Sequence, residues 1–203
     1  MTLKIGVLAS HGGSNMQAII DNIEAGTLAA EIVLVISNNS GSGAIQRAVR
    51  HRLPWKHLSS ATHPDPRELD LAIRDALLVA GAHVVILAGY MKKIGPDTLS
   101  AFEGRMLNIH PALLPRHGGP GMYGIRPHEA VLAAGDEESG ATVHVVTGDY
   151  DQGPILRQRR VPVYLDDAPE DLQRRVLKEE HLIYSEVIRD IVAGEIKLPV
   201  SES

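Results

Sequence analysis

Asn108 and His110 are the residues of this chain whose types and spacing most clearly suggest chemistry. They lie in the run Arg-Met-Leu-Asn-Ile-His-Pro-Ala-Leu-Leu-Pro at residues 105–115, which begins as an apolar strand and ends at a proline. Residues i and i+2 of a strand project from the same face, so the amide and the imidazole point together beyond the strand end. An amide can donate a hydrogen bond to a developing oxyanion, and an imidazole can carry a proton. The pair is therefore typical of a site for acyl transfer.

A carboxylate that could join this pair lies in the segment Thr-Gly-Asp-Tyr-Asp-Gln-Gly at residues 147–153. Asp149 and Asp151 stand there on a glycine-flanked turn. Aspartates in such turns are often only turn formers. Combined with an amide and an imidazole, however, a carboxylate completes a set that suits proton transfer beside a stabilised oxyanion.

The loop Ser10-His-Gly-Gly-Ser-Asn15 is a candidate anion site, because it joins an apolar strand to the start of a helix. Backbone N–H groups and the helix dipole favour a negative ligand at that position. The loop is neither a Walker A sequence nor a dinucleotide fingerprint, so a single phosphate is the expected ligand. A plain tight turn explains the loop equally well when it is taken alone. The candidate phosphate ligands are Gly12, Gly13, Ser14 and Asn15.

Apolar periodicity in the first half of the chain predicts alternating strands and helices. Strands are expected at Leu3–Leu8, 31–37, 55–58 and 83–87, with helices from Ser14, around 44–49 and over 65–80. Ser14 and Gln17 have the spacing of a capping box, which predicts that the first helix begins there. The order β-α-β-α-β-α-β predicts a parallel sheet with right-handed crossovers.

The second half is less regular. We expect a strand at 106–109, a long glycine- and proline-rich loop at 111–127, strands at 142–147 and 155–163, and a helix at 169–193. The last two strands could form an antiparallel pair at one sheet edge. The fold class is therefore α/β, with one doubly wound, mostly parallel sheet in a single domain over residues 1–203. Such folds bind ligands at the carboxyl edge of the sheet, where the anion loop and the Asn-x-His pair both fall.

Composition sets limits on partners and location. The chain of 203 residues carries 20 basic and 25 acidic side chains, a net charge of −5, which argues against a nucleic-acid partner. It has no cysteine, which excludes disulfides and thiol nucleophiles. No signal-peptide pattern or membrane-spanning apolar stretch is present, so we expect a cytoplasmic protein without a membrane partner. Aromatic residues make up only 3% of the chain, so aliphatic side chains are expected to fill the core.

Histidines offer a metal site as another hypothesis. His110, His117, His128 and His144 could in principle gather around an ion. No short ligand pair such as His-x-x-x-His occurs, so we predict no metal.

Four motifs carry a resemblance to a known family. The chain resembles the phosphoribosylglycinamide (glycinamide ribonucleotide) formyltransferases of the folate-dependent formyltransferase superfamily, from Lys4 to about Val192. The motifs are Ala9-Ser-His-Gly-Gly-Ser-Asn-Met-Gln-Ala-Ile, Leu87-Ala-Gly-Tyr-Met, Leu107-Asn-Ile-His-Pro-Ala-Leu-Leu-Pro and Asp149-Tyr-Asp-Gln-Gly-Pro-Ile. The loop Arg116–Arg126 is longer than the family's common form, and Leu177 replaces a polar residue found in some members.

The resemblance implies a Rossmann-like formyltransferase fold and a set of site residues. The catalytic residues it implies are Asn108, His110 and Asp151, and the phosphate loop is the one named above. Glu180, which alone would be taken for a surface residue, is implied to bind substrate. The implied folate-binding residues are Arg67 (for the glutamate tail), Tyr90, Met91, Lys92, Lys93, Ile94, Asn108, Gly148 and Asp149.

The implied reaction moves a formyl group from 10-formyltetrahydrofolate, a co-substrate, to the amine of glycinamide ribonucleotide in purine biosynthesis. Asn108 and a protonated His110 would stabilise the tetrahedral intermediate, and Asp151 would favour the charged imidazole and pass the amine proton onward through a water. No covalent enzyme intermediate or metal is expected, and the protein is expected to be a monomer or homodimer.

Three alternatives remain open at this point. A 10-formyltetrahydrofolate hydrolase would use similar residues, but is expected to carry an extra N-terminal domain. A transfer-RNA formyltransferase is expected to carry a basic C-terminal extension. A non-catalytic nucleotide-binding domain explains the glycine loop but not Asn108 and His110 together.

Overall fold

A seven-stranded sheet with the strand order β3-β2-β1-β4-β5-β6-β7 runs through the protein, as a computed structural model that describes residues 2–198 shows. The strands are β1 (Leu3–Ala9), β2 (Ala30–Ser37), β3 (Trp55–His57), β4 (Val84–Leu87), β5 (Met106–His110), β6 (Glu138–Val145) and β7 (Ile155–Pro162). Pairing is parallel from β3 to β5 and antiparallel from β5 to β7. The prediction of a mostly parallel sheet with an antiparallel C-terminal edge is therefore confirmed.

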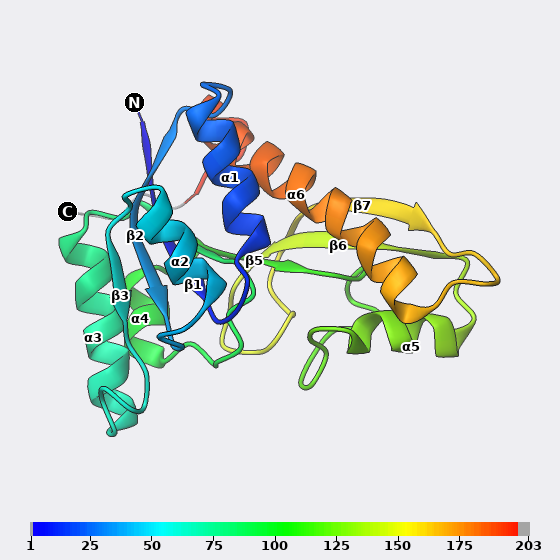
Figure 1. Cartoon of the computed structure of the whole chain (residues 1–203), viewed down its shortest axis with the longest axis horizontal. Helices are drawn as coiled ribbons and strands as arrows, with labels where there is room; N and C mark the ends of the chain where they lie inside the picture. Colours follow the sequence, from blue (N-terminus) through cyan, green and yellow to red (C-terminus); the bar gives the residue numbers. More distant parts are fainter. Residues whose placement is uncertain (1, 199–203) are drawn as a thin grey trace.

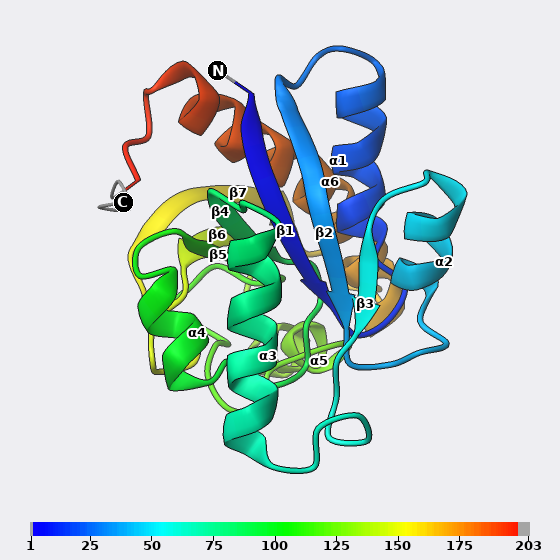
Figure 2. The ribbon, with the colours of Figure 1, turned by 90° about the vertical axis from the view of Figure 1, so that its left-hand side faces the viewer.

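Helices cover both faces of this sheet. They are α1 (Ser14–Glu24), α2 (Gly43–Arg50), α3 (Pro66–Val79), α4 (Pro96–Ala101), α5 (Arg126–Ala134) and α6 (Pro169–Ala193). Figure 2 shows α3 and α4 on one side of the sheet and α1 and α2 on the other. The long helix α6 packs on α1, β6 and β7, and α5 packs on α6 (Figure 1). No helix within residues 2–198 combines the length and apolar character needed to cross a membrane.

The side chains of β1 alternate between two hydrophobic cores. Ile5 and Val7 belong to the core beneath α1 and α6, whereas Leu8 belongs to the core beneath α3. Between them, Gly6 lets α3 approach closely, since a Cβ placed there would lie 2.5 Å from Leu77 Cδ2. A strand covered on both faces reads as a continuous apolar run, which explains the pattern of this segment.

Two aromatic residues lie at the centre of the cores, so the expectation of a purely aliphatic interior is wrong. Phe102 and Tyr184 are the largest fully buried side chains. The Tyr184 hydroxyl lies 3.2 Å from the carbonyl oxygen of Leu87 and 2.9 Å from that of Leu107, and donates to them. A buried tyrosine needs such partners, and these lie on β4 and β5.

The first helix begins at Ser14 as predicted, but the predicted capping box is absent. The residue before it, Gly13, adopts φ 69° and no side chain caps the helix. The Gln17 amide instead donates to Asp21 at 2.8 Å and accepts from Arg47 at 2.8 Å. The first N–H groups of α1 are thus left without a side-chain cap, as an anion site requires.

The short helices α4 and α5 were not predicted. Asp70 of α3 caps α4 from outside by accepting hydrogen bonds from the backbone N–H groups of Asp97 (2.8 Å) and Thr98 (3.1 Å). Helix α5 begins at Arg126, inside the segment expected to be loop, and the sixth strand begins at Glu138 rather than Thr142.

The sheet has its topological switch point between β1 and β4. The chain leaves β1 towards β2 and leaves β4 towards β5, on opposite sides. Ser10 ties the two diverging loops together, since its N–H donates to the Gly89 carbonyl at 3.1 Å and its hydroxyl accepts from the Met91 N–H at 2.8 Å. A crevice at the carboxyl edge of the sheet follows from this divergence, and doubly wound folds bind ligands there.

Candidate active site

Two adjoining cavities lie at the carboxyl edge of the sheet. The larger, of about 660 Å³, extends from the first loop past β5 to α6, and includes Gly12, Gly13, Ser14, Asn15, Asn108, His110, Asp151 and Glu180 among its lining residues. The smaller, of about 80 Å³, lies between the loop after β4 and the turn at 147–151. Four residues line both: Tyr90, Asn108, Tyr150 and Asp151. A ligand in each cavity would therefore meet its neighbour beside Asn108 and Asp151.

The structure brings together the three residues that the sequence singled out. His110 Nδ1 lies 3.4 Å from Asp151 Oδ2, and Asn108 stands two residues before His110 on β5. Asp151 Oδ1 lies 3.4 Å from His144 Nε2, which in turn lies 3.1 Å from Asn108 Nδ2. The amide, two imidazoles and the carboxylate thus form one continuous polar cluster.

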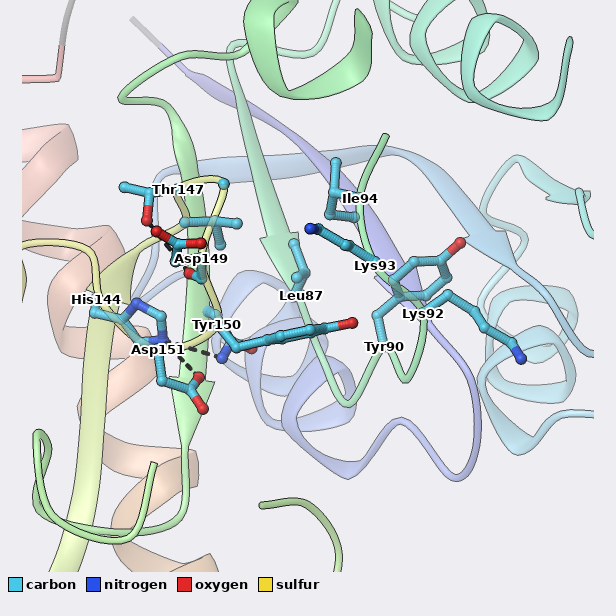
Figure 3. Close-up of a pocket in the computed structure, with 13 residues that line it drawn as sticks. Leu87, Tyr90, Lys92, Lys93, Ile94, His144, Thr147, Asp149, Tyr150 and Asp151 are labelled. Atoms are coloured by element: carbon cyan, nitrogen blue, oxygen red, sulfur yellow. Dashed lines mark hydrogen bonds and ion pairs between the residues drawn. The ribbon is translucent and has the colours of Figure 1, made fainter. Parts of the chain in front are cut away.

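His144 is the member of this cluster that sequence reasoning did not assign to catalysis. It is directly opposite Asn108 in the antiparallel pairing of β5 with β6. Figure 3 shows His144 and Asp151 side by side at one end of the smaller cavity, with the Tyr150 ring extending from there towards Tyr90. No local pattern could have revealed this position without the register between the two strands.

His110 is buried, with an acceptor near each of its ring nitrogens. Its Nε2 lies 2.8 Å from the backbone carbonyl of His117, and because a carbonyl only accepts, Nε2 carries a hydrogen. Burial lowers the pKa of His110 below 6.5, although Asp151 and the His117 carbonyl oppose that effect. A pKa below 6.5 favours the neutral imidazole at pH 7, and the expected protonation of His110 at the tetrahedral intermediate stays a prediction.

Asp151 occupies a strained backbone position with several donors around it. Its φ of 57° lies in the left-handed region that non-glycine residues seldom adopt, and such strain is concentrated at functional sites. Burial acts to raise the pKa of Asp151, but the hydrogen bond with His144, the charge of His110 and the N–H of Gly119 at 2.9 Å together lower it. Asp151 is therefore ionised at neutral pH and acts as an acceptor.

The first loop lines the larger cavity at the N-terminus of α1. Arg47 of α2 donates from Nε to the Gly12 carbonyl at 2.9 Å, which fixes the loop from behind. Asn15 donates to Glu180 Oε2 at 2.8 Å, while its own Oδ1 is buried without a partner. Burial raises the pKa of Glu180, although Asn15 opposes this effect. Glu180 is thus a buried acid facing the cavity rather than a surface residue.

The candidate folate residues divide into those at the cavities and one that lies apart. Lys92, Lys93, Ile94, Gly148 and Asp149 line the smaller cavity, Met91 lines the larger, and Tyr90 lines both. Figure 3 shows the side chains of Lys92 and Lys93 pointing in opposite directions. Burial, with a contribution from Asp70, raises the pKa of Tyr90 to about 12, so its hydroxyl stays protonated. Arg67 is exposed in the first turn of α3 and lines neither cavity.

Of the four histidines considered for a metal site, three contact an aspartate and one lies in the wall of the larger cavity. His110 and His144 contact Asp151, and His117 contacts Asp136. His128 is buried in the wall of the larger cavity, with Nδ1 unpaired. Within residues 2–198, no group of three or more histidine, cysteine or acidic side chains is arranged to hold an ion.

His128 predicts a loss of stability in mild acid. Burial, with a contribution from His110, lowers its pKa from 6.5 to about 4. The unfolded chain then binds the proton first as the pH falls, so stability is lost from about pH 6.5 towards pH 4. Between pH 7 and pH 5 this residue should lower the free energy of unfolding by about 2 kcal/mol, since one pKa unit corresponds to about 1.4 kcal/mol.

Urea unfolding at the two pH values measures this effect. His128→Gln should show a distinctly smaller decrease between pH 7 and pH 5 than the unsubstituted protein. His63→Gln, at a histidine in the loop before α3, is the matched control and should keep the full decrease. An identical decrease in both variants would show that His128 does not titrate as described.

Comparison with known proteins places the chain in a family. Residues 3–188 match the family described as formyl transferase. A chloroplastic phosphoribosylglycinamide formyltransferase of Arabidopsis thaliana is 40% identical over 195 residues, which are 96% of this chain and 67% of the relative. The phosphoribosylglycinamide formyltransferase of Haemophilus influenzae is 36% identical over 195 residues, 96% of this chain and 90% of the relative.

A solved structure gives the same result. The glycinamide ribonucleotide transformylase 1 of Symbiobacterium toebii has a TM-score of 0.90 with this chain at 38% identity, and the match covers 98% of this chain and 91% of that one. The chain therefore belongs to the formyl transferase family, together with the phosphoribosylglycinamide formyltransferases.

Proposed function

We propose that this protein transfers a formyl group from 10-formyltetrahydrofolate to the amine of glycinamide ribonucleotide, a step of purine biosynthesis. The observation that carries the proposal is the junction of the two cavities at Asn108 and Asp151. One cavity begins at a helix N-terminus suited to a phosphate, and the other lies between two loops suited to a flat ring. The family and its relatives support the same reaction.

The ribonucleotide would occupy the larger cavity. Its phosphate would accept hydrogen bonds from the backbone at Gly12–Asn15, where the dipole of α1 favours negative charge. Glu180 and the unpaired Asn15 Oδ1 are acceptors in the same wall and would receive hydroxyl or amide hydrogens of the substrate. This arrangement directs the amine towards β5.

The folate would occupy the smaller cavity, with its ring between the segment 90–94 and the turn 147–151. The polar and backbone groups of these loops would fix the orientation of the ring. Arg67 is not at this cavity, so a role for it is restricted to a glutamate tail that extends beyond the ring site. The formyl group would then lie at the shared wall beside Asn108.

The chemical step requires charge stabilisation and proton transfer. The neutral amine, with a pKa of about 8, attacks the formyl carbon. The oxygen of the tetrahedral intermediate becomes negative, and Asn108 Nδ2 is the donor placed to stabilise it. Because the donor is already in place before the reaction, little reorganisation is needed when the charge develops.

His110 and Asp151 would manage the amine proton. In the resting state the Nδ1 of His110 is unprotonated and lies 3.4 Å from Asp151 Oδ2. A proton leaving the amine can enter this gap, directly or through a water, and is then held between the imidazole and the carboxylate. The resulting imidazolium has an acceptor at each nitrogen. When the intermediate collapses, the bond between the formyl carbon and N10 would break, and the held proton would pass from His110 to N10, directly or through a water, so that tetrahydrofolate leaves with an N–H.

An absorbance assay of 10-formyltetrahydrofolate, run with and without glycinamide ribonucleotide, tests the proposal. Loss of the formyl folate only when the amine is present is the expected result. Loss without the amine would indicate a hydrolase, and no loss in either case would indicate a binding protein.

Ser14→Glu tests the assignment of the first loop. Ser14 is the first residue of α1 and lines the larger cavity, so a carboxylate there faces the phosphate. The KM for the ribonucleotide should rise by about tenfold or more, which corresponds to 1.4 kcal/mol or more, while the KM for the folate stays unchanged. Steady-state kinetics with each substrate varied in turn measures both. Ser14→Ala, which adds no charge, should raise the KM for the ribonucleotide far less. Equal increases for the two substrates in Ser14→Glu would contradict the assignment.

A further inference from the structure

The carbonyl of His117 has a specific effect on His110. It accepts a hydrogen bond from His110 Nε2 at 2.8 Å, so in the neutral imidazole the other nitrogen, Nδ1, is left without a hydrogen. Nδ1 is the nitrogen that faces Asp151. The carbonyl therefore determines which nitrogen of His110 can exchange a proton beside the substrate.

The backbone at His117 would not by itself keep the His117 carbonyl turned towards His110. Its φ is 54°, in the left-handed region, and the glycines Gly118 and Gly119 follow. Such a conformation is unfavourable for a residue with a Cβ and persists only when its surroundings enforce it. A separate contact must therefore keep the carbonyl turned towards His110.

Asp136 provides that contact. Its Oδ2 lies 2.7 Å from Nε2 of the His117 imidazole, and its other oxygen pairs with Arg116. Asp136 follows the end of α5, where Gly135 caps the helix in the left-handed conformation, and its N–H bonds the Val131 carbonyl at 3.3 Å. Only 9% of the Asp136 side chain is exposed. Asp136 is thus fixed in the connection between α5 and β6, while the loop that contains His117 lines the larger cavity.

We propose that Asp136 is a positioning residue for the reaction, because it holds His117 so that the His117 carbonyl keeps His110 in the Nε2–H tautomer. This inference rests on the formyl transfer proposed above. Neither Asp136 nor His117 lines the cavities, so neither contacts substrate. The charge of Asp136 supports this role, since the hydrogen bond with His117 lowers the pKa of Asp136 and keeps it ionised at neutral pH. The other titratable groups around His110 are Asp151, His144 and His128.

Three single variants and one double variant test this role. Asp136→Ala, His117→Ala and the double variant that combines them each remove the contact between Asp136 and His117. Arg116→Gln removes only the exposed ion pair of Asp136 with Arg116 and is the matched control. Asp136→Ala and His117→Ala should each lower kcat by about tenfold or more, because small displacements of a catalytic group are costly, and should leave both KM values within twofold. The kcat of the double variant should be no lower than that of Asp136→Ala or His117→Ala, because the same interaction is lost in each of these variants.

The ¹⁵N chemical shifts of His110 provide the decisive readout. The unsubstituted protein and Arg116→Gln should show the Nε2–H tautomer, and Asp136→Ala and His117→Ala should show a mixture together with a shifted pH profile of kcat. Variants that melt at lower temperature but keep the tautomer and the pH profile would overturn the inference, because the pair would then be only structural. The tautomer is measured without turnover, so a failure of this inference is distinguishable from a failure of the proposed formyl transfer.

Discussion

Asn108→Ala should lower kcat by a factor of about 10² to 10³ while the protein remains folded. The loss is the one expected when a single oxyanion donor is removed from an acyl-transfer site. Asn108 is only partly buried at the wall shared by the two cavities, so its truncation leaves no large void in either hydrophobic core. Steady-state kinetics and thermal unfolding of the same preparation measure the two quantities.

Asn108→Asp is the matched variant, because it keeps the shape of the side chain and removes the donor. Its kcat should be as low as that of Asn108→Ala or lower, since a carboxylate beside a developing oxyanion is repulsive. Turnover within threefold of the unsubstituted enzyme in Asn108→Ala would remove Asn108 from the oxyanion site.

Asp151→Asn should lower both turnover and the pKa of His110. Asp151 opposes the effect of burial on His110, so neutralising it should move the His110 titration to still lower pH. Without the carboxylate the imidazole also loses the partner that would stabilise it after proton uptake. A loss of about 10² in kcat is expected, at the lower end of general acid–base effects.

An NMR titration of His110 and a kinetic assay test this prediction together. Asp149→Asn is the control. Asp149 lies in the same turn, but its hydrogen bond within that turn does not involve His110 or His144, which both contact Asp151. This variant should therefore leave the His110 titration unchanged. If Asp151→Asn leaves the titration in place as well, Asp151 has no electrostatic role in the site.

The parts of the site that lie on regular elements could be predicted from the sequence. Asn108 and His110 both line the larger cavity because strand periodicity places i and i+2 on one face. The first loop and β5 meet at the carboxyl edge because the alternating pattern predicts a parallel sheet. These inferences needed only local periodicity and the order of elements.

Other features depend on contacts between distant segments. His144 joins the cluster through the register of β5 with β6, and Glu180 is buried because α6 packs on α1, where Asn15 meets it. Helix α4 has only six residues, too few for a periodic pattern, and Asp70 caps it from 27 positions away. Arg67 shows the converse, since the resemblance implies a folate contact for it, but it lines neither cavity.

His110 illustrates how packing changes a prediction about charge. The type of residue and the nearby aspartate suggested an imidazolium. Burial, which the sequence does not show, outweighs that aspartate and lowers the pKa. With a neutral resting form, His110 acquires the charge proposed for it by taking up the amine proton during the reaction.

A crystal structure with a stable folate analogue and glycinamide ribonucleotide bound together is the most direct test of the proposed reaction. We expect the phosphate on the backbone of residues 12–15, the folate ring between segments 90–94 and 147–151, and the amine and the formyl position meeting within hydrogen-bond reach of Asn108 and His110. A folate ring bound away from the smaller cavity, or an amine directed away from β5, would contradict formyl transfer at this site.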